Sequence, residues 1–151
     1  MRKILYIALV ALTVCGCDKQ SDNGDLDGMW QFLTVSYHSA LAEEDSIVDI
    51  KAGKVYLSFQ LDLAQIKSVN LDLDPEAISV LMRFDHSGDR LTLYDFYHHY
   101  RTADSLFTDA DSLLLAPLGI KGSTCDFTVQ KLNSQSMELS SDYADITFRK
   151  F

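Results

Sequence analysis

The histidines are the side chains of this sequence best suited to chemistry, and two of them are adjacent. His98 and His99 follow Asp95 closely, and His86 lies a little earlier in the chain. If this run is a strand, Asp95 and His99 share one face and His98 points to the other, because side chains alternate along a strand. A zinc-type site needs a further group of ligands at suitable spacing, and the sequence offers none. We therefore expect solvated residues at a strand end, with no metal site and no cofactor.

The sequence gives little support to nucleophilic or calcium chemistry. It contains no Gly-x-Ser-x-Gly motif. Cys125 stands beside Asp126 rather than a basic group, in an alternating run that predicts a small buried side chain. The acidic stretch 72–76 lacks the glycine and the terminal glutamate of a calcium-binding loop, so a polar loop is expected. We predict no catalytic residues and no enzymatic activity.

The best-defined motif lies near the N-terminus and ends at Cys17. Arg2 and Lys3 precede an apolar run over residues 4–14, which has the size of a signal peptide and is too short to span a bilayer of about 30 Å. The residues Val14-Cys15-Gly16-Cys17 that follow resemble the lipobox of bacterial lipoproteins, with Cys17 as the residue that is lipidated. Cys15 fits less well, because bulky Val14 precedes it.

This motif predicts three segments: a signal peptide over 1–16, a lipidated flexible tether over 17–25, and a folded domain over 26–151. A diacylglycerol on Cys17 together with an acyl chain on its amine would anchor the protein stably. The alternative, a transmembrane anchor, would need roughly 20 apolar residues. We expect a bacterial cell-envelope protein held by lipid on the outer membrane, and the sequence leaves the periplasmic and the surface face open.

The charge and the cysteine content of the chain restrict its binding partners and its means of stabilisation. The net charge is −9, and it becomes −11 once Arg2 and Lys3 leave with the signal peptide, since all 22 acidic residues come later. Such a surface repels phosphate backbones, so no nucleic-acid partner is expected. Removal of Cys15 and lipidation of Cys17 leave Cys125 without a disulfide partner. The domain must therefore be stabilised by packing.

Alternating apolar residues predict an all-β domain with little helix. A run with apolar residues at every second position is typical of a strand with one buried face. Such runs are separated by short turns, among them 86–89 and 133–135, and a helical turn is expected over 108–117. The pattern is typical of an antiparallel sandwich or an up-and-down barrel. The runs cover 26–37, 55–66, 77–85, 90–97, 124–132, 136–140 and 146–151.

Three features resemble the lipocalins and, more closely, the lipocalin-like lipoproteins of Bacteroides-type bacteria. Gly28-x-Trp30 opens the first run, Arg149 stands in the last, and the lipobox precedes both. The resemblance implies a single antiparallel barrel of about eight strands. It implies that Gly28, Trp30 and Arg149 close one end of the barrel, with the arginine packed over the indole. A cation on an aromatic face is worth about 0.5–2 kcal/mol.

Aromatic side chains suggest two functions for such a barrel. If they point inward, they line a cavity for a small apolar or amphipathic ligand, bound without catalysis. The expected lining residues are Trp30, Tyr56, Phe84, Tyr94 and Phe96. If the barrel is filled instead, outward aromatic residues and acidic loops would make it a protein-interaction or inhibitor module. The sequence does not separate these alternatives.

Overall fold

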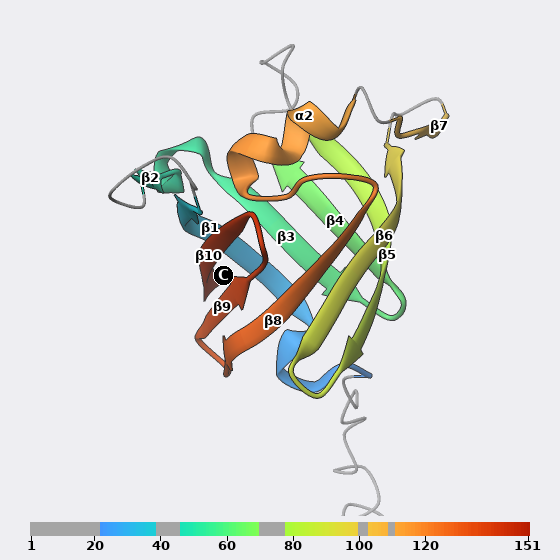
Figure 1. Cartoon of the computed structure of the whole chain (residues 1–151). Helices are drawn as coiled ribbons and strands as arrows, with labels where there is room; N and C mark the ends of the chain where they lie inside the picture. Colours follow the sequence, from blue (N-terminus) through green and yellow to red (C-terminus); the bar gives the residue numbers. More distant parts are fainter. Residues whose placement is uncertain (1–21, 39–45, 70–77, 100–102, 109–110) are drawn as a thin grey trace, which may run out of the picture.

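A computed structural model describes residues 22–38, 46–69, 78–99, 103–108 and 111–151. The predicted signal peptide, Cys17 and the acidic stretch 72–76 lie outside the described residues. Strands dominate the fold (Figure 1). They are β1 (Gly28–Tyr37), β2 (Ser46–Asp49), β3 (Val55–Gln60), β4 (Leu63–Ser68), β5 (Ser79–Ser87), β6 (Arg90–His98), β7 (Ser105–Leu106), β8 (Thr124–Leu132), β9 (Ser136–Ser140) and β10 (Ala144–Lys150).

Eight of these strands close into an antiparallel barrel. Each of β3, β4, β5, β6, β8, β9 and β10 pairs with the barrel strand before it in the chain, and β10 pairs with β1 to complete the ring. This is an up-and-down barrel, as predicted. The short strands β2 and β7 extend the edges of β1 and β6. Closure leaves the ring without a free edge, which protects a β protein from edge-to-edge association.

Alternation along the strands determines which side chains enter the barrel. In β8, Cys125 and Phe127 are buried whereas Thr124, Asp126 and Thr128 are exposed, and β9 and β10 follow the same period. Gly88 has φ of +61° in the β5–β6 hairpin, where glycine adopts the left-handed conformation at low cost. The run 55–66, for which the sequence allows one strand or two strands with a bend, is two strands, β3 and β4, joined by Leu61 and Asp62.

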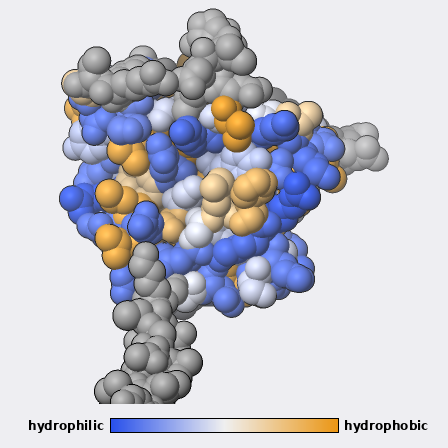
Figure 2. Space-filling view, turned by 180° about the vertical axis from the view of Figure 1, so that it is seen from behind, coloured by the Kyte–Doolittle hydropathy of each residue, from blue (hydrophilic) through white to orange (hydrophobic). Residues whose placement is uncertain are grey.

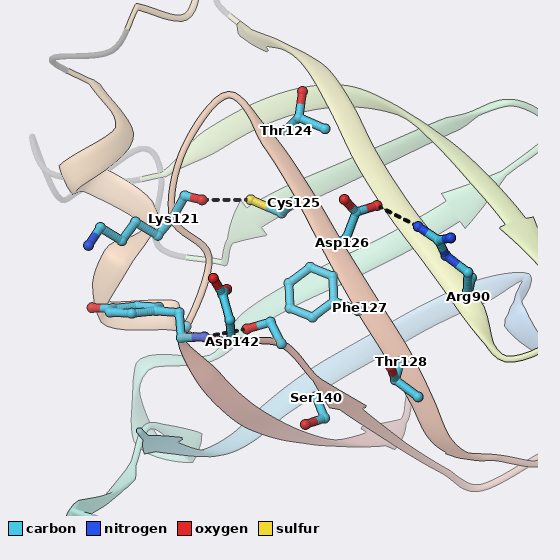
Figure 3. Close-up of a pocket in the computed structure, with 12 residues that line it drawn as sticks. Arg90, Lys121, Thr124, Cys125, Asp126, Phe127, Thr128, Ser140 and Asp142 are labelled. Carbon is cyan, nitrogen blue, oxygen red and sulfur yellow. Dashed lines mark hydrogen bonds and ion pairs between the residues drawn. The ribbon is translucent and has the colours of Figure 1, made fainter. Parts of the chain in front are cut away.

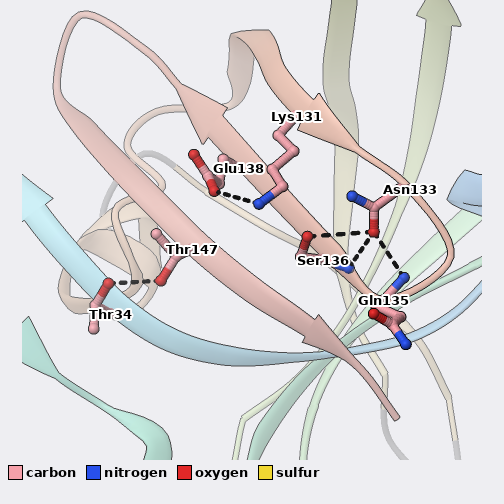
Figure 4. Close-up of polar contacts among 7 residues, drawn as sticks. All are labelled: Thr34, Lys131, Asn133, Gln135, Ser136, Glu138 and Thr147. Atoms are coloured by element: carbon pink, nitrogen blue, oxygen red, sulfur yellow. Dashed lines mark hydrogen bonds and ion pairs between the residues drawn. The ribbon is translucent and has the colours of Figure 1, made fainter.

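Polar contacts fix the β8–β9 hairpin and the closure of the ring (Figure 4). The Asn133 side-chain oxygen accepts hydrogen bonds from the backbone amides of Gln135 and Ser136, at 2.9 Å each. These bonds define the turn between β8 and β9. Across the β1–β10 pair, the hydroxyls of Thr34 and Thr147 share a hydrogen bond of 2.6 Å on the outer face. The register of both pairings is thus supported by side chains as well as by the backbone ladder.

Side chains fill the interior of the barrel in the part of the chain that the structure describes. The inward residues come from all eight barrel strands, and most are 0–3% exposed. A water-filled cavity would leave its lining residues with measurable exposure, so the barrel has a packed core. The largest of these side chains are Trp30, Phe32, Phe59, Leu57, Ile66, Met82, Leu91, Leu93 and Phe148.

The start of the fold differs from the predicted boundary. A 3-10 turn, η2 (Gly24–Leu26), precedes β1 and buries Leu26 completely. The Asn23 side-chain amide donates to Asp27 at 2.7 Å and to the Leu61 carbonyl at 2.9 Å. Residues 23–25, assigned from the sequence to a flexible tether, therefore form an ordered turn, which Asn23 and the Asp25 carbonyl join to the barrel by hydrogen bonds.

Candidate functional site

The upper end of the barrel is covered by a short segment between β7 and β8 (Figure 1). This cover consists of α2 (Ser112–Leu115) and the 3-10 turn η5 (Ala116–Leu118), and it continues to Ile120. Leu115, Leu118 and Ile120 are 1–5% exposed and belong to the same apolar core as the barrel. The helical turn predicted over 108–117 is present, but its sequence did not reveal that it closes the barrel.

Gly119 sets the cover tightly against the barrel wall. Its φ is +80°, and an added Cβ would lie 2.9 Å from an Ile146 side-chain carbon and 3.1 Å from one of Val35. Those distances are closer than ordinary van der Waals contact. The position therefore requires glycine both for its backbone conformation and for space.

Few polar contacts join the cover to the barrel among the described residues. The Tyr37 hydroxyl donates to the Pro117 carbonyl at 2.8 Å, and His98 Nε2 lies 3.4 Å from an Asp111 carboxylate oxygen. Hydrogen bonds from the Thr108 hydroxyl and amide hold the pKa of Asp111 below its ordinary value. The contact with His98 also lowers the pKa of Asp111. The cover is thus held mainly by the burial of apolar side chains, a non-directional attraction.

Aromatic rings lie near the start of this cover, because His98 contacts both the Phe107 ring and Asp111, the residue before α2. The Phe96 and Phe107 ring centroids are 5.6 Å apart, and the His98 and Phe107 rings are 5.0 Å apart. Phe96 and Phe107 are buried, and the His98 side chain is 16% exposed. The upper end therefore combines two buried phenylalanine rings with one partly exposed imidazole ring. This mixture of apolar walls and a few polar groups is typical of small-molecule sites.

Three of the five predicted lining residues face the interior, and two do not. Trp30, Phe84 and Phe96 are core residues of the barrel. Tyr56 pairs with Gln31 and Tyr94 pairs with Arg83, so both tyrosines lie on the outer face. The prediction of Tyr56 and Tyr94 as lining residues was wrong. Tyr56 is nevertheless buried, because Phe151 covers its ring from outside at a centroid distance of 5.1 Å.

A bulge in β6 explains the pattern of aromatic residues on both faces of that strand. Asp95 has φ of +52°, and the register with β5 shifts between the pairs Leu81–Tyr97 and Arg83–Tyr94. One extra residue on a strand reverses its alternation. Leu91 and Leu93 therefore point inward before the bulge, and Phe96 does so after it.

The lower end of the barrel is closed around Trp30, and the cation above its ring differs from the predicted one. Lys150 Nζ lies 4.4 Å from the centroid of the Trp30 ring, whereas Arg149 is on the outer face. The register explains this correction: Lys150 pairs with Trp30, and Arg149 pairs with Gln31. Gly28 approaches the same lysine, since its Cβ would lie 3.1 Å from a Lys150 side-chain carbon.

The histidines do not converge on one site. His99 Nδ1 lies 2.8 Å from an Asp104 carboxylate oxygen, and His98 turns toward the cover. His86 is near the opposite end of β5, where it pairs with Leu91. Within the described residues, no group of three histidine, cysteine or acidic side chains is arranged to hold a metal ion.

A surface pocket lies beside Cys125, where β8 pairs with β6 but not yet with β9 (Figure 3). It has a volume of about 570 Å³, with polar side chains of both charges around it. The Cys125 thiol donates to the Lys121 carbonyl at 3.1 Å, and burial raises its pKa to about 11. A protonated, buried thiol is a poor nucleophile. The prediction of a small buried side chain at this position is confirmed.

The comparisons with known proteins agree with this architecture. A family model described as a lipocalin-like domain matches residues 10–151, which is nearly the whole chain. The chain belongs to this lipocalin-like family. Together with the closed ring of eight strands, this match confirms the resemblance seen in the sequence and the predicted fold class.

Two solved structures share the fold. A lipocalin-like protein from Bacteroides uniformis is 21% identical, with a TM-score of 0.57, over 85% of this chain and all of that one. An uncharacterised protein from Bacteroides eggerthii is 15% identical, also with a TM-score of 0.57, over 83% of this chain and 99% of that one. A comparison with curated proteins found no match. Among the described residues, no helix has the length and apolar character needed to cross a membrane.

Proposed function

We propose that this lipocalin-like protein binds a small apolar or amphipathic molecule at the upper end of its barrel, without catalysis. The observation that carries this proposal is the cover, a short apolar segment whose buried side chains belong to the same core as the aromatic residues Phe96 and Phe107. The interior is already filled, so the ligand must take space that Leu115, Leu118 and Ile120 occupy. An apolar ligand that displaces the cover replaces the lost apolar contacts of the cover with its own. The free-energy cost of displacing the cover is therefore small for such a ligand.

A second candidate function has its own observation. The filled interior supports a barrel that acts as a rigid protein-interaction or inhibitor module, in which the outer surface binds the partner. Exposed apolar side chains are available for such contacts. Ile47, Leu106 and Leu113 are 66–73% exposed, and Figure 2 shows separate apolar groups on a largely hydrophilic face. In this case the cover would never leave the barrel.

For both functions we propose that the protein resides in the cell envelope. The lipobox-like motif ending at Cys17 supports lipid anchoring, with the membrane as the partner of the chain's N-terminus. The net charge of −9 is unfavourable for nucleic acid. Neither function requires a cofactor.

Uptake of a neutral apolar probe distinguishes the two functions. The full chain carrying Cys17→Ser is titrated with N-phenylnaphthylamine, and energy transfer from Trp30, the single tryptophan, reports binding near the barrel. Saturable transfer that increases in Gly119→Ala, whose cover is loosened, supports binding under the cover. Gly88→Ala is the matched control, because its Cβ would meet nothing within 4 Å. Absence of saturable transfer in all three proteins would favour the interaction module.

A further inference from the structure

An open groove on the outer face of the barrel combines aromatic and cationic side chains. It has a volume of about 890 Å³ and lies between η3 (Lys51–Gly53), the start of β3 and the end of β10. Tyr56, Val69 and Phe151 provide its apolar surface, with Phe151 73% exposed and in edge contact with Tyr56. The Phe151 amide donates to the Met29 carbonyl at 2.8 Å, which fixes this ring beside β1.

Three cations surround this aromatic surface in a protein that is otherwise strongly acidic. Lys51, Lys54 and Arg149 line the groove, and among the described residues none of them forms an ion pair. Asp49 is the one acidic side chain in the lining, and one of its oxygens accepts from the Lys51 amide at 3.0 Å. The side chains that line the groove therefore carry a net positive charge.

Arg149 is held in position by a buried glutamine. The Gln31 side chain is 3% exposed, and its oxygen accepts a hydrogen bond of 2.8 Å from Arg149 Nε. Its amide nitrogen in turn donates to the Lys51 carbonyl at 3.1 Å. With Nε engaged, the two terminal nitrogens of the guanidinium have no hydrogen-bond partner among the described residues and can bind another acceptor. A planar fork fixed in this way matches a carboxylate, which it can bind through two parallel hydrogen bonds.

The geometry points to a binding site in this groove for an amphipathic carboxylate. The carboxylate pairs with Arg149 and is supported by Lys51 and Lys54, and an aromatic or alkyl body lies on Tyr56 and Phe151. This site is outside the barrel and separate from the cover. The proposal of this site is therefore independent of the proposed function and is tested separately. Sequence analysis missed it, because Tyr56 was placed inside the barrel and Arg149 over Trp30.

Three small probes separate the contributions of charge and apolar surface. The full chain carrying Cys17→Ser is titrated calorimetrically with phenylbutyrate, with the neutral phenylbutanol, and with acetate, which lacks the apolar body. We expect phenylbutyrate to bind most tightly. Arg149→Gln should raise its dissociation constant about tenfold, as expected for a lost charge-assisted contact. The neutral probe should be unaffected by this substitution.

A matched variant and a positioning variant complete the test. Arg90→Gln removes the same charge from an exposed arginine paired with Asp126, outside the groove, and should leave binding unchanged. Gln31→Ala should weaken phenylbutyrate but not phenylbutanol, which a general loss of structure would not do. Equal weakening by Arg149→Gln and Arg90→Gln would overturn the proposal. So would equal affinity for all three probes, or no binding of phenylbutyrate to a protein with an unchanged melting temperature.

Discussion

Lys150 Nζ lies 4.4 Å from the centroid of the Trp30 ring, at the lower end of the barrel. The same ammonium group donates to the backbone carbonyls of Asp25 and Asp27, and the Trp30 indole N–H donates to the Leu26 carbonyl at 2.8 Å. Two side chains on neighbouring strands thus tie the turn η2 to the barrel. Burial lowers the pKa of Lys150, and the nearby Asp25 and Asp27 oppose that effect.

Removing the indole should strongly destabilise the fold. Trp30 is completely buried and packs at the centre of the lower end. Trp30→Ala should therefore lower the free energy of unfolding by about 3–5 kcal/mol, which is the usual loss for a buried aromatic side chain. Urea denaturation followed by circular dichroism measures this change. A loss below about 1 kcal/mol would show that Trp30 does not close the barrel.

Removing the cation should have a smaller effect. Lys150→Met keeps much of the apolar stem but leaves two carbonyls without their donor, and should cost about 0.5–2 kcal/mol. Lys131→Met is the control, because this lysine is half exposed and pairs with Glu138 on the surface (Figure 4). Lys131→Met should lower the free energy of unfolding by no more than about 0.5 kcal/mol. Equal effects in the two variants would contradict the role of Lys150.

The tight packing of the cover against the barrel wall can be tested with two glycines of similar backbone conformation. Gly119 and Gly88 have φ of +80° and +61°, but only a side chain at residue 119 would collide with Ile146 and Val35. Gly88→Ala should cost about 1 kcal/mol for the left-handed backbone. Gly119→Ala should cost about 1–3 kcal/mol more, because it also overpacks the contact. Similar melting temperatures for the two variants would mean that the cover is not tightly seated.

Cys125 should make the protein less stable in alkali. Burial raises the thiol pKa from 9.0 to about 11. The folded state therefore keeps a proton that the unfolded state loses, so stability is intact below pH 9.0 and falls as the pH rises toward about 11. Denaturation midpoints measured across this range should decline less steeply in Cys125→Ala. Rapid reaction of the native thiol with a maleimide at neutral pH would contradict this account.

Cys17 should decide where the protein resides. Cell fractionation should place the wild-type chain in the membrane fraction if, as we propose, lipid chains on Cys17 anchor it. Cys17→Ser should yield a folded protein that is released from membranes. Retention of the variant in membranes at the wild-type level would refute anchoring through Cys17.

The barrel itself was predictable from sequence because period-two alternation survives in most of its strands. The hairpin of β5 and β6 and the final three strands were found close to their observed bounds. The short strands β2 and β7 were missed, since strands of four and two residues carry too little periodicity to be recognised.

The candidate sites were less predictable, because each depends on which face a residue occupies. The bulge at Asp95 reverses the alternation of β6, and a left-handed aspartate has no clear signal in a single sequence. Arg149 and Lys150 are adjacent in the chain, so a register error of one residue exchanges their roles. The cover is a tertiary feature: the sequence indicated its helical turn, but nothing local shows that Leu115 and Leu118 enter the barrel.

Native mass spectrometry of the protein released gently from its own cell envelopes tests the ligand-binding account most directly. We predict a noncovalent adduct of a single small amphipathic molecule, which is lost on denaturation and is depleted in a variant that alters the upper end, Phe96→Ala. The lipid proposed on Cys17 is covalently bound, so it would survive denaturation and be distinguished from the ligand. A mass without a noncovalent adduct, together with no uptake of the neutral probe, would contradict the account and leave the filled barrel as an interaction module.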